Sequence, residues 1–239
     1  MPIERHVIIH EGPSGPFESM AVYDPDAGPQ PGILFFPNFL GTKEWDFAKA
    51  EEIAAQGYKV FVVDYYGQGK RATGMGDPKA PEYMTELVSD RAAMRDRLLD
   101  ALAELKKLPG VDVSKCAAIG FCLGGKCVLD LARAGSDIKG GVSFHGVYDA
   151  PPFPNAAIKA KLLVLHGWND PLCPPEATVA LANELTASGA DWQIHANGHT
   201  GHAFTADNVP MDENKTFGFQ PDTDRRSWQS MWNFFAEIF

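Results

Sequence analysis

The segment G-F-C-L-G-G at residues 120–125 constrains the fold of this chain more than any other feature of its sequence. It follows a short apolar run, residues 117–119, and precedes residues 128–132, whose apolar side chains recur with helical spacing. That order predicts a strand, a tight turn and a helix, with Cys122 at the apex of the turn. Glycines on both sides of the cysteine remove side chains where the turn is sharpest and where the helix passes closest to the sheet.

Strand-like and helix-like runs alternate along most of the chain, which favours a mostly parallel, doubly wound sheet with helices on both faces. We expect strands at residues 7–10, 20–23, 32–36, 59–64, 115–119, 140–144, 161–166 and 191–195. A Gly- and Pro-rich turn separates the first two and predicts an antiparallel hairpin at a sheet edge. In addition to the helix after Cys122, we expect helices at residues 46–56, 83–108, 176–188 and 224–238. We also expect a surface loop at residues 66–82. No linker or repeat interrupts the pattern, so we expect one α/β domain over residues 1–239.

The composition argues against several classes of protein. The formal net charge is −10 and the isoelectric point is about 5.1. A nucleic-acid surface needs clustered Lys and Arg to neutralise phosphates, so we expect no nucleic-acid partner. A membrane span needs a run of about 18 apolar residues, which this sequence lacks. The N-terminus lacks the basic-then-apolar pattern of a signal peptide, so we expect a cytoplasmic protein that does not bind membranes.

The four cysteines have spacings that match no zinc-binding pattern. Cytoplasmic thiols stay reduced, so no disulfide is expected. Cys116 lies in a predicted strand and Cys127 in the helix after the turn, and both are expected to be small buried side chains. Cys122 differs because the apex of a strand-to-helix turn faces outward.

Residues suited to acyl transfer follow three of the predicted strands. In open parallel sheets, ligands bind at the carboxyl ends of the strands. Cys122, Asp170 and His202 follow strands in the order nucleophile, acid, base, which is the order of α/β-hydrolases. The helix N-terminus favours the Cys122 thiolate. His202 is placed to take the thiol proton, and Asp170 to hold His202 in the productive tautomer. His199, three residues earlier, is an alternative base.

An acyl transfer also needs hydrogen-bond donors that stabilise an oxyanion. The backbone N–H of Leu123, directly after the proposed nucleophile, is one candidate. The N–H of Phe39, in the loop after the strand expected at residues 32–36, is the other.

Three motifs occur in this chain in a fixed order: G-F-C-L-G-G at residues 120–125, H-G-x-x-D at 166–170 and G-H-A-F at 201–204. On these motifs the sequence resembles the dienelactone hydrolase family of α/β-hydrolases, from about residue 38 to residue 204. The resemblance implies an α/β-hydrolase fold and a triad of Cys122, His202 and Asp170. It also implies hydrolysis of a small-molecule ester or lactone through an acyl-enzyme, without metal or cofactor. We expect a monomer or a homodimer.

Two positions differ from the dienelactone hydrolases proper. Those enzymes have a glutamate before the oxyanion-hole residue that takes part in activating the thiol, whereas this chain has Asn38, which cannot act as a base. They also place an arginine just after His-x-Phe to bind a substrate carboxylate, whereas Thr205 and Ala206 follow Phe204 here. Both differences indicate that the pocket around Cys122 has changed.

The side chains expected to line the substrate pocket are Asn38, Tyr65, Trp168 and Phe204. Tyr65 and Trp168 fit core positions equally well. His145 and His166 end strands and are expected to be structural. Two other functions stay open: a non-hydrolytic ligand-binding or redox-responsive thiol protein, and an amidase or peptidase of the same superfamily.

Overall fold

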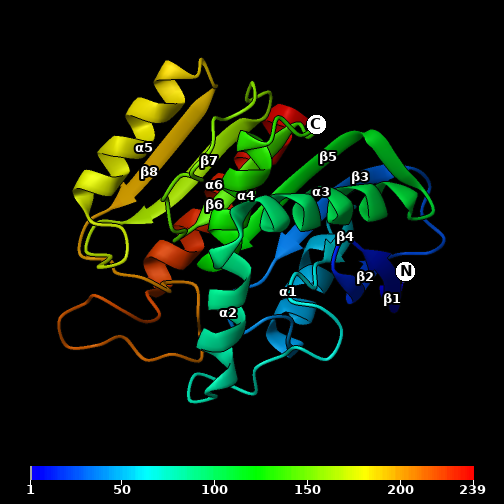
Figure 1. Ribbon diagram of the computed structural model, residues 1–239, viewed down its shortest axis with the longest axis horizontal. Coiled ribbons are helices and arrows are strands. Elements are labelled where there is room, and N and C mark those ends of the chain that lie inside the picture. Colours follow the sequence, from blue (N-terminus) through cyan, green and yellow to red (C-terminus); the bar gives the residue numbers. More distant parts are fainter. Residues whose placement is uncertain (1) are drawn as a thin grey trace. The chain divides into compact units, whose positions relative to one another are not determined.

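The computed structural model describes residues 2–239 and divides into two compact units, the first ending at Ala118 and the second beginning at Ile119. Figure 1 labels the helices and strands named below. The strands are β1 (Glu4–Gly12), β2 (Gly15–Tyr23), β3 (Gln30–Phe36), β4 (Lys59–Val62), β5 (Val111–Phe121), β6 (Gly140–Phe144), β7 (Lys161–Gly167) and β8 (Trp192–Asn197). The helices are α1 (Glu44–Ala54), α2 (Lys79–Ser89), α3 (Arg91–Lys107), α4 (Leu123–Arg133), α5 (Pro175–Ala187) and α6 (Pro221–Ile238). β5 is the strand that runs from the first unit into the second.

The first unit has the strand order β1-β2-β4-β3-β5. β1 and β2 form an antiparallel hairpin, with Gly12 opposite Gly15 at its turn, and β1 lies at the sheet edge as predicted. β2 pairs with β4 antiparallel, and β3 pairs with β4 parallel. The hairpin therefore adds an antiparallel edge to parallel strands.

Helices cover both faces of the sheet in the first unit. Successive side chains of a strand point to opposite faces. On β1, Arg5 forms ion pairs with Glu44 and Glu51 of α1, whereas His10 lies against Asp100 of α3. Because residues 5 and 10 differ in parity, α1 and α3 lie on opposite faces.

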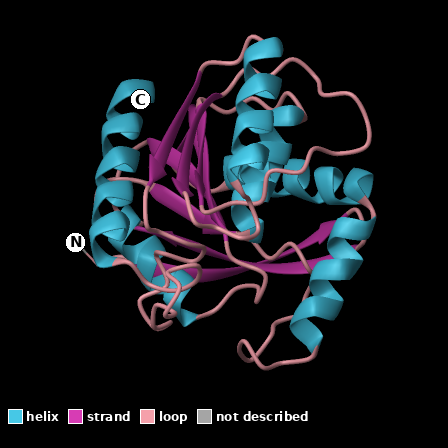
Figure 2. Cartoon of the chain, turned by 90° about the vertical axis from the view of Figure 1, so that its left-hand side faces the viewer, coloured by secondary structure: helices cyan, strands magenta, loops and turns pink. Residues whose placement is uncertain are grey.

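In the second unit, β6 pairs with β7 and β7 pairs with β8, both in parallel. β6 is buried along its whole length, as a strand covered on both faces must be. A Cβ at Gly140 of β6 would lie 2.8 Å from the Phe234 ring of α6. A Cβ at Gly125 of α4 would lie 2.6 Å from Ser143 Oγ of β6. Gly140 and Ser143 point to opposite faces, so α6 and α4 flank the strands, and Figure 2 shows helices on either side of them.

The predicted mostly parallel sheet with helices on both faces is confirmed. The predicted hairpin and the other predicted strands are present, with ends that differ by a few residues. The single domain over residues 1–239 stays a prediction. Among residues 2–239, no helix is long and apolar enough to cross a membrane.

The prediction of one helix over residues 83–108 is wrong. Two helices, α2 and α3, meet at Asp90, whose backbone leaves the helical region at φ −120° and ψ 89°. The Asp90 carboxylate accepts hydrogen bonds from the N–H groups of Ala92 and Ala93, so it caps the start of α3. The loop expected at residues 66–82 is also too long, because α2 begins at Lys79. The helix-forming residues on both sides of Asp90 hid this capping signal.

Candidate active site

Cys122 occupies a strained turn between β5 and α4. Its backbone has φ 56° and ψ −114°, a conformation that costs a non-glycine residue about 1–3 kcal/mol. The turn is held by hydrogen bonds from Cys122 N to Phe144 O at 3.1 Å and from Lys126 N to Cys122 O at 3.3 Å. A Cβ at Gly120 would lie 2.1 Å from the carbonyl oxygen of Gly124, so no side chain fits there. The two glycines therefore allow the close approach that places Cys122 at the N-cap of α4.

His202 and Asp170 form a buried hydrogen-bonded pair. His202 Nδ1 lies 2.7 Å from Asp170 Oδ2, and their side chains are 2% and 0% exposed. The second carboxylate oxygen of Asp170 accepts a hydrogen bond from Leu172 N at 2.8 Å. This arrangement fixes the carboxylate and leaves Nε2 as the imidazole nitrogen that can exchange a proton.

Glycines bring the loop that carries His202 against β7. A Cβ at Gly167, the last residue of β7, would lie 2.4 Å from Gly201 O. A Cβ at Gly201 would lie 2.0 Å from the backbone of Thr216. Thr216 O in turn accepts a hydrogen bond from His202 N at 2.8 Å. The backbone is thus packed too tightly for a side chain at position 167 or at position 201.

The thiol of Cys122 and the imidazole of His202 interact electrostatically. Burial acts to raise the pKa of the thiol, but the charge of His202 and the Leu123 N–H outweigh it, so that this pKa is lowered. Burial also acts against a charge on His202, but the Cys122 thiolate and the Asp170 carboxylate outweigh it and raise the pKa of His202. Both shifts favour a thiolate–imidazolium pair.

The four thiols have different surroundings. Cys122 is partly exposed, whereas Cys116, Cys127 and Cys173 are buried, as expected for the first two of these. Cys173 Sγ lies 3.3 Å from Gly146 O, and burial raises the pKa of Cys173 to about 12. Cys173 is therefore an unreactive thiol within the same unit.

His145 packs against His202, a contact that the sequence interpretation missed. The two rings meet edge to face, with centroids 5.1 Å apart. His145 Nε2 lies 2.8 Å from Thr205 Oγ1, and Phe217 stacks on His202 from 5.8 Å. Burial and the charge of His202 hold the pKa of His145 well below its usual value, so its ring stays neutral. The residue also has φ 38°, which a sequence pattern does not reveal.

The remaining predicted residues of this unit have mixed surroundings. His199 is exposed, so the structure brings His202 and not His199 to Asp170. Trp168 is 43% exposed, and its interpretation as a core residue is wrong. Phe204 is fully buried and meets the edge of the His145 ring. His166 is held between the hydroxyls of Tyr148 and Thr178, which fits the structural role expected for it.

Asn38, Phe39 and Tyr65 belong to the first unit. Asn38 Oδ1 accepts hydrogen bonds from Leu40 N and Lys43 Nζ, both at 3.0 Å, so this side chain stabilises its own loop. Tyr65 is buried, and its hydroxyl donates to Asn38 O at 2.5 Å. The Tyr66 hydroxyl donates to Phe39 O at 2.9 Å. The oxyanion-hole roles of Leu123 and Phe39 and the pocket roles of Asn38, Tyr65, Trp168 and Phe204 stay predictions.

Comparison with known proteins shows which family the chain belongs to. The sequence profile of the dienelactone hydrolase family matches residues 17–239. A solved structure named m3DLH is 33% identical, with a TM-score of 0.89 over 99% of both chains. A dienelactone hydrolase-like promiscuous phosphotriesterase from metagenomic libraries is 29% identical, with a TM-score of 0.91 over 100% of both chains. A Yersinia pestis protein provisionally named carboxymethylenebutenolidase is 27% identical over 90% of this chain and 80% of its own length.

These matches extend over nearly the whole chain and include the motifs that carry Cys122, Asp170 and His202. The sheet and its flanking helices are accordingly those of an α/β-hydrolase. The chain is a hydrolase that belongs to the dienelactone hydrolase family.

Proposed function

We propose that this protein hydrolyses a small ester or lactone, with Cys122 as nucleophile, His202 as acid and base, and Asp170 as the residue that orients His202. The observation that carries the proposal is the buried 2.7 Å hydrogen bond between Asp170 and His202, coupled to a thiol of lowered pKa at a helix N-terminus. The name of the Yersinia pestis relative supports hydrolysis of a lactone.

Acylation begins from the thiolate–imidazolium pair. The Cys122 thiolate attacks the carbonyl carbon, and the carbonyl electron pair moves to oxygen to give a tetrahedral oxyanion. When the intermediate collapses, the C–O bond of the leaving group breaks, and His202 gives its proton to the departing alkoxide. The products of this half-reaction are an alcohol and a thioester on Cys122. A lactone keeps its alcohol as part of the acyl group.

Deacylation reverses these roles. His202, now neutral, takes a proton from water while the water oxygen attacks the thioester carbonyl. Collapse of the second tetrahedral intermediate breaks the C–S bond and regenerates the thiolate beside the imidazolium. The Asp170 carboxylate keeps its hydrogen bond to His202 Nδ1 and stabilises the charge on His202. In both half-reactions, the N–H group of Leu123 donates to the oxyanion.

We further propose that the part of the substrate acyl group that lies near His202 carries no charge. Thr205 and Ala206 follow Phe204, in the stretch where dienelactone hydrolases proper have an arginine for a substrate carboxylate, and the Thr205 hydroxyl is hydrogen bonded to His145 Nε2 at 2.8 Å. Thr205 is also only 3% exposed. A neutral, buried hydroxyl that already has a partner offers no charge to a carboxylate. Neutral esters and lactones therefore suit this position better than a dienelactone carboxylate.

The test is a panel of matched substrates: a neutral lactone, the same lactone bearing a carboxylate, an activated ester and the corresponding anilide. We expect turnover of the neutral lactone and the ester, with a lower kcat/KM for the carboxylate form. Mass spectrometry after rapid quenching should find an acyl group on Cys122. In the Cys122→Ala variant, that adduct should be missing and kcat/KM should fall by about 10⁴-fold or more.

Cys173→Ala is the matched control, because it removes a buried thiol of the same unit that has no place in the proposed mechanism. It should keep both the adduct on Cys122 and the activity. An adduct without turnover across the ester panel would instead support a ligand-binding or redox-responsive thiol. Faster cleavage of the anilide than of the ester would support an amidase.

A further inference from the structure

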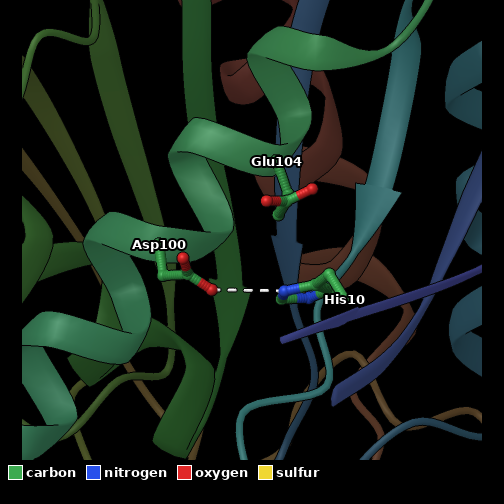
Figure 3. Close-up of side chains that lie close together, drawn as sticks. All are labelled: His10, Asp100 and Glu104. Carbon is green, nitrogen blue, oxygen red and sulfur yellow. Dashed lines mark ion pairs between the residues drawn. The ribbon is translucent and has the colours of Figure 1, made fainter. Parts of the chain in front are cut away.

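Three side chains that bind metals in other proteins converge in the first unit, apart from the triad in sequence and in chemistry. His10 projects from β1, and Asp100 and Glu104 project from α3, as Figure 3 shows. One ligand atom of each residue lies within 4.8 Å of those of the other two. Asp100 and Glu104 are four residues apart, so they share one helix face. Two carboxylates on one face are therefore aimed at one imidazole.

The surroundings of His10 indicate more than an ion pair with Asp100. Its side chain is only 8% exposed, yet neither ring nitrogen has a hydrogen-bond partner among the described residues. Nδ1 lies 3.2 Å from Asp100 Oδ2, but the contact does not meet hydrogen-bond geometry, and this oxygen has no hydrogen-bond partner either. Leaving a buried imidazole without a hydrogen-bond partner destabilises the folded state, so a ligand that binds both groups is favoured.

The surroundings fix the three side chains in place. The ring of Phe17 stacks on His10, with centroids 5.5 Å apart and planes 22° apart. A Cβ at Gly12 would lie 3.0 Å from Asp100 Oδ2, so this glycine leaves room for the carboxylate next to the strand. Glu104 is 12% exposed and forms an ion pair with Lys107. The cluster is thus partly pre-organised.

We propose that His10, Asp100 and Glu104 form a binding site for Zn²⁺. One imidazole nitrogen and two carboxylate oxygens are a donor set that zinc accepts in sites with three protein ligands, with water in the fourth position. Mg²⁺ and Ca²⁺ prefer oxygen ligands alone and fit this set less well. Binding requires a neutral His10, so any proton on the ring is released to solvent, and Glu104 exchanges Lys107 for the metal.

The proposed site would tie the edge strand β1 to α3. Because the unfolded chain does not bring residues 10, 100 and 104 together, zinc would bind the folded state preferentially and raise its stability. The role assigned to the metal is structural. It is independent of the hydrolase mechanism, whose residues lie elsewhere in the sequence.

The experiment is calorimetric titration of ZnCl₂ into the full-length Cys122→Ser protein, a background that removes the reactive thiol as a competing ligand. We expect one zinc per chain and an increase in Tm on adding zinc, with no increase at the same concentration of MgCl₂. His10→Gln and Glu104→Gln should each weaken zinc binding by more than about tenfold. His6→Gln is the matched control, since it removes another histidine of β1, and its affinity should stay unchanged.

X-ray absorption at the zinc edge provides a second measurement that does not depend on a variant. The expected shell contains nitrogen and oxygen only. A shell containing sulfur, or an affinity that His10→Gln and Glu104→Gln leave unchanged, would overturn the proposal. Circular dichroism of each zinc-free variant checks that the loss of binding is not loss of folding. If His10→Gln does not fold, the zinc affinity of Glu104→Gln and the absorption spectrum test the proposed site.

Discussion

Each unit of the molecule holds a histidine whose Nδ1 faces an aspartate, and the two pairs differ in hydrogen bonding, in burial and in the third group beside them. His202 and Asp170 are hydrogen bonded at 2.7 Å, with side chains 2% and 0% exposed. His10 and Asp100 are 3.2 Å apart without hydrogen-bond geometry, with side chains 8% and 24% exposed. The third member is a thiol for the first pair and the carboxylate of Glu104 for the second.

This difference shows that a His–Asp pair has no fixed function. A short hydrogen bond to one carboxylate fixes the imidazole tautomer and leaves Nε2 for proton transfer to a third group. Two carboxylates around an imidazole without a hydrogen bond instead supply lone pairs that can converge on a cation. The hydrogen bond and the third group, rather than the pair itself, separate a catalytic interpretation from a metal-binding one.

Replacing the histidine of each pair should give the largest difference between the pairs, measured as the loss of kcat/KM. His202→Gln should lower kcat/KM by about 10⁴-fold, because it removes both the acid and the base of the proposed mechanism. His10→Gln should leave kcat/KM within about twofold, since His10 has no place in that mechanism. Steady-state hydrolysis of an activated ester by both variants measures the contrast. Equal losses for the two would contradict the assignment of the triad.

Replacing the aspartate of each pair should also give different losses of kcat/KM, but the difference should be smaller. Asp170→Asn keeps the size of the side chain but can donate to Nδ1, which favours the wrong tautomer of His202, so kcat/KM should fall by about 10³-fold. Asp100→Asn should not change it. The pH profile adds a specific readout: without the Asp170 charge, the raised pKa of His202 should fall, and the basic limb should move to lower pH. A loss of activity with an unmoved basic limb would point to a structural effect.

The second unit was largely predictable because its chemistry follows local patterns. The glycines at 120 and 124 predicted the turn at Cys122, and the residues after β7 and β8 predicted that Asp170 and His202 would meet. The contact between His145 and His202 was not predictable from the sequence alone. It depends on the neighbouring positions of β6 and β7 and on a histidine with positive φ, and neither leaves a periodic signal.

In the first unit, the strands could be predicted from the sequence, but the cluster of His10, Asp100 and Glu104 could not. The hairpin of β1 and β2 follows from alternation and a turn, whereas the convergence of His10 with Asp100 and Glu104 depends on how α3 packs on β1. His10 and Asp100 are ninety residues apart in the sequence, so no spacing rule connects them. The break at Asp90 was missed for a related reason, because a single capping residue competes with many helix formers around it.

The alkylation rate of Cys122 tests whether His202, and not His10, lowers the pKa of this thiol. Because the pKa of Cys122 is lowered, the midpoint of its alkylation rate with iodoacetamide should lie below pH 9, the usual thiol pKa. Cys173, with a pKa near 12, should react more than about 10²-fold more slowly. In His202→Gln the midpoint for Cys122 should move to higher pH, whereas in His10→Gln it should stay. Peptide mapping over a pH series gives both rates.

The smallest expected effect concerns the ring that supports each histidine. His10 is stacked on Phe17, and His202 meets the edge of His145, a neutral ring tied to Thr205. His145→Phe keeps an aromatic edge but loses the bond to Thr205, so His202 should be held less firmly and kcat should fall by about tenfold with little change in KM. Thr205→Val removes the same bond from the other side and should give a similar loss. If the two losses add fully in the double variant, the hydrogen bond is not what positions the ring; if the double variant is no worse than His145→Phe, the bond is the shared cause.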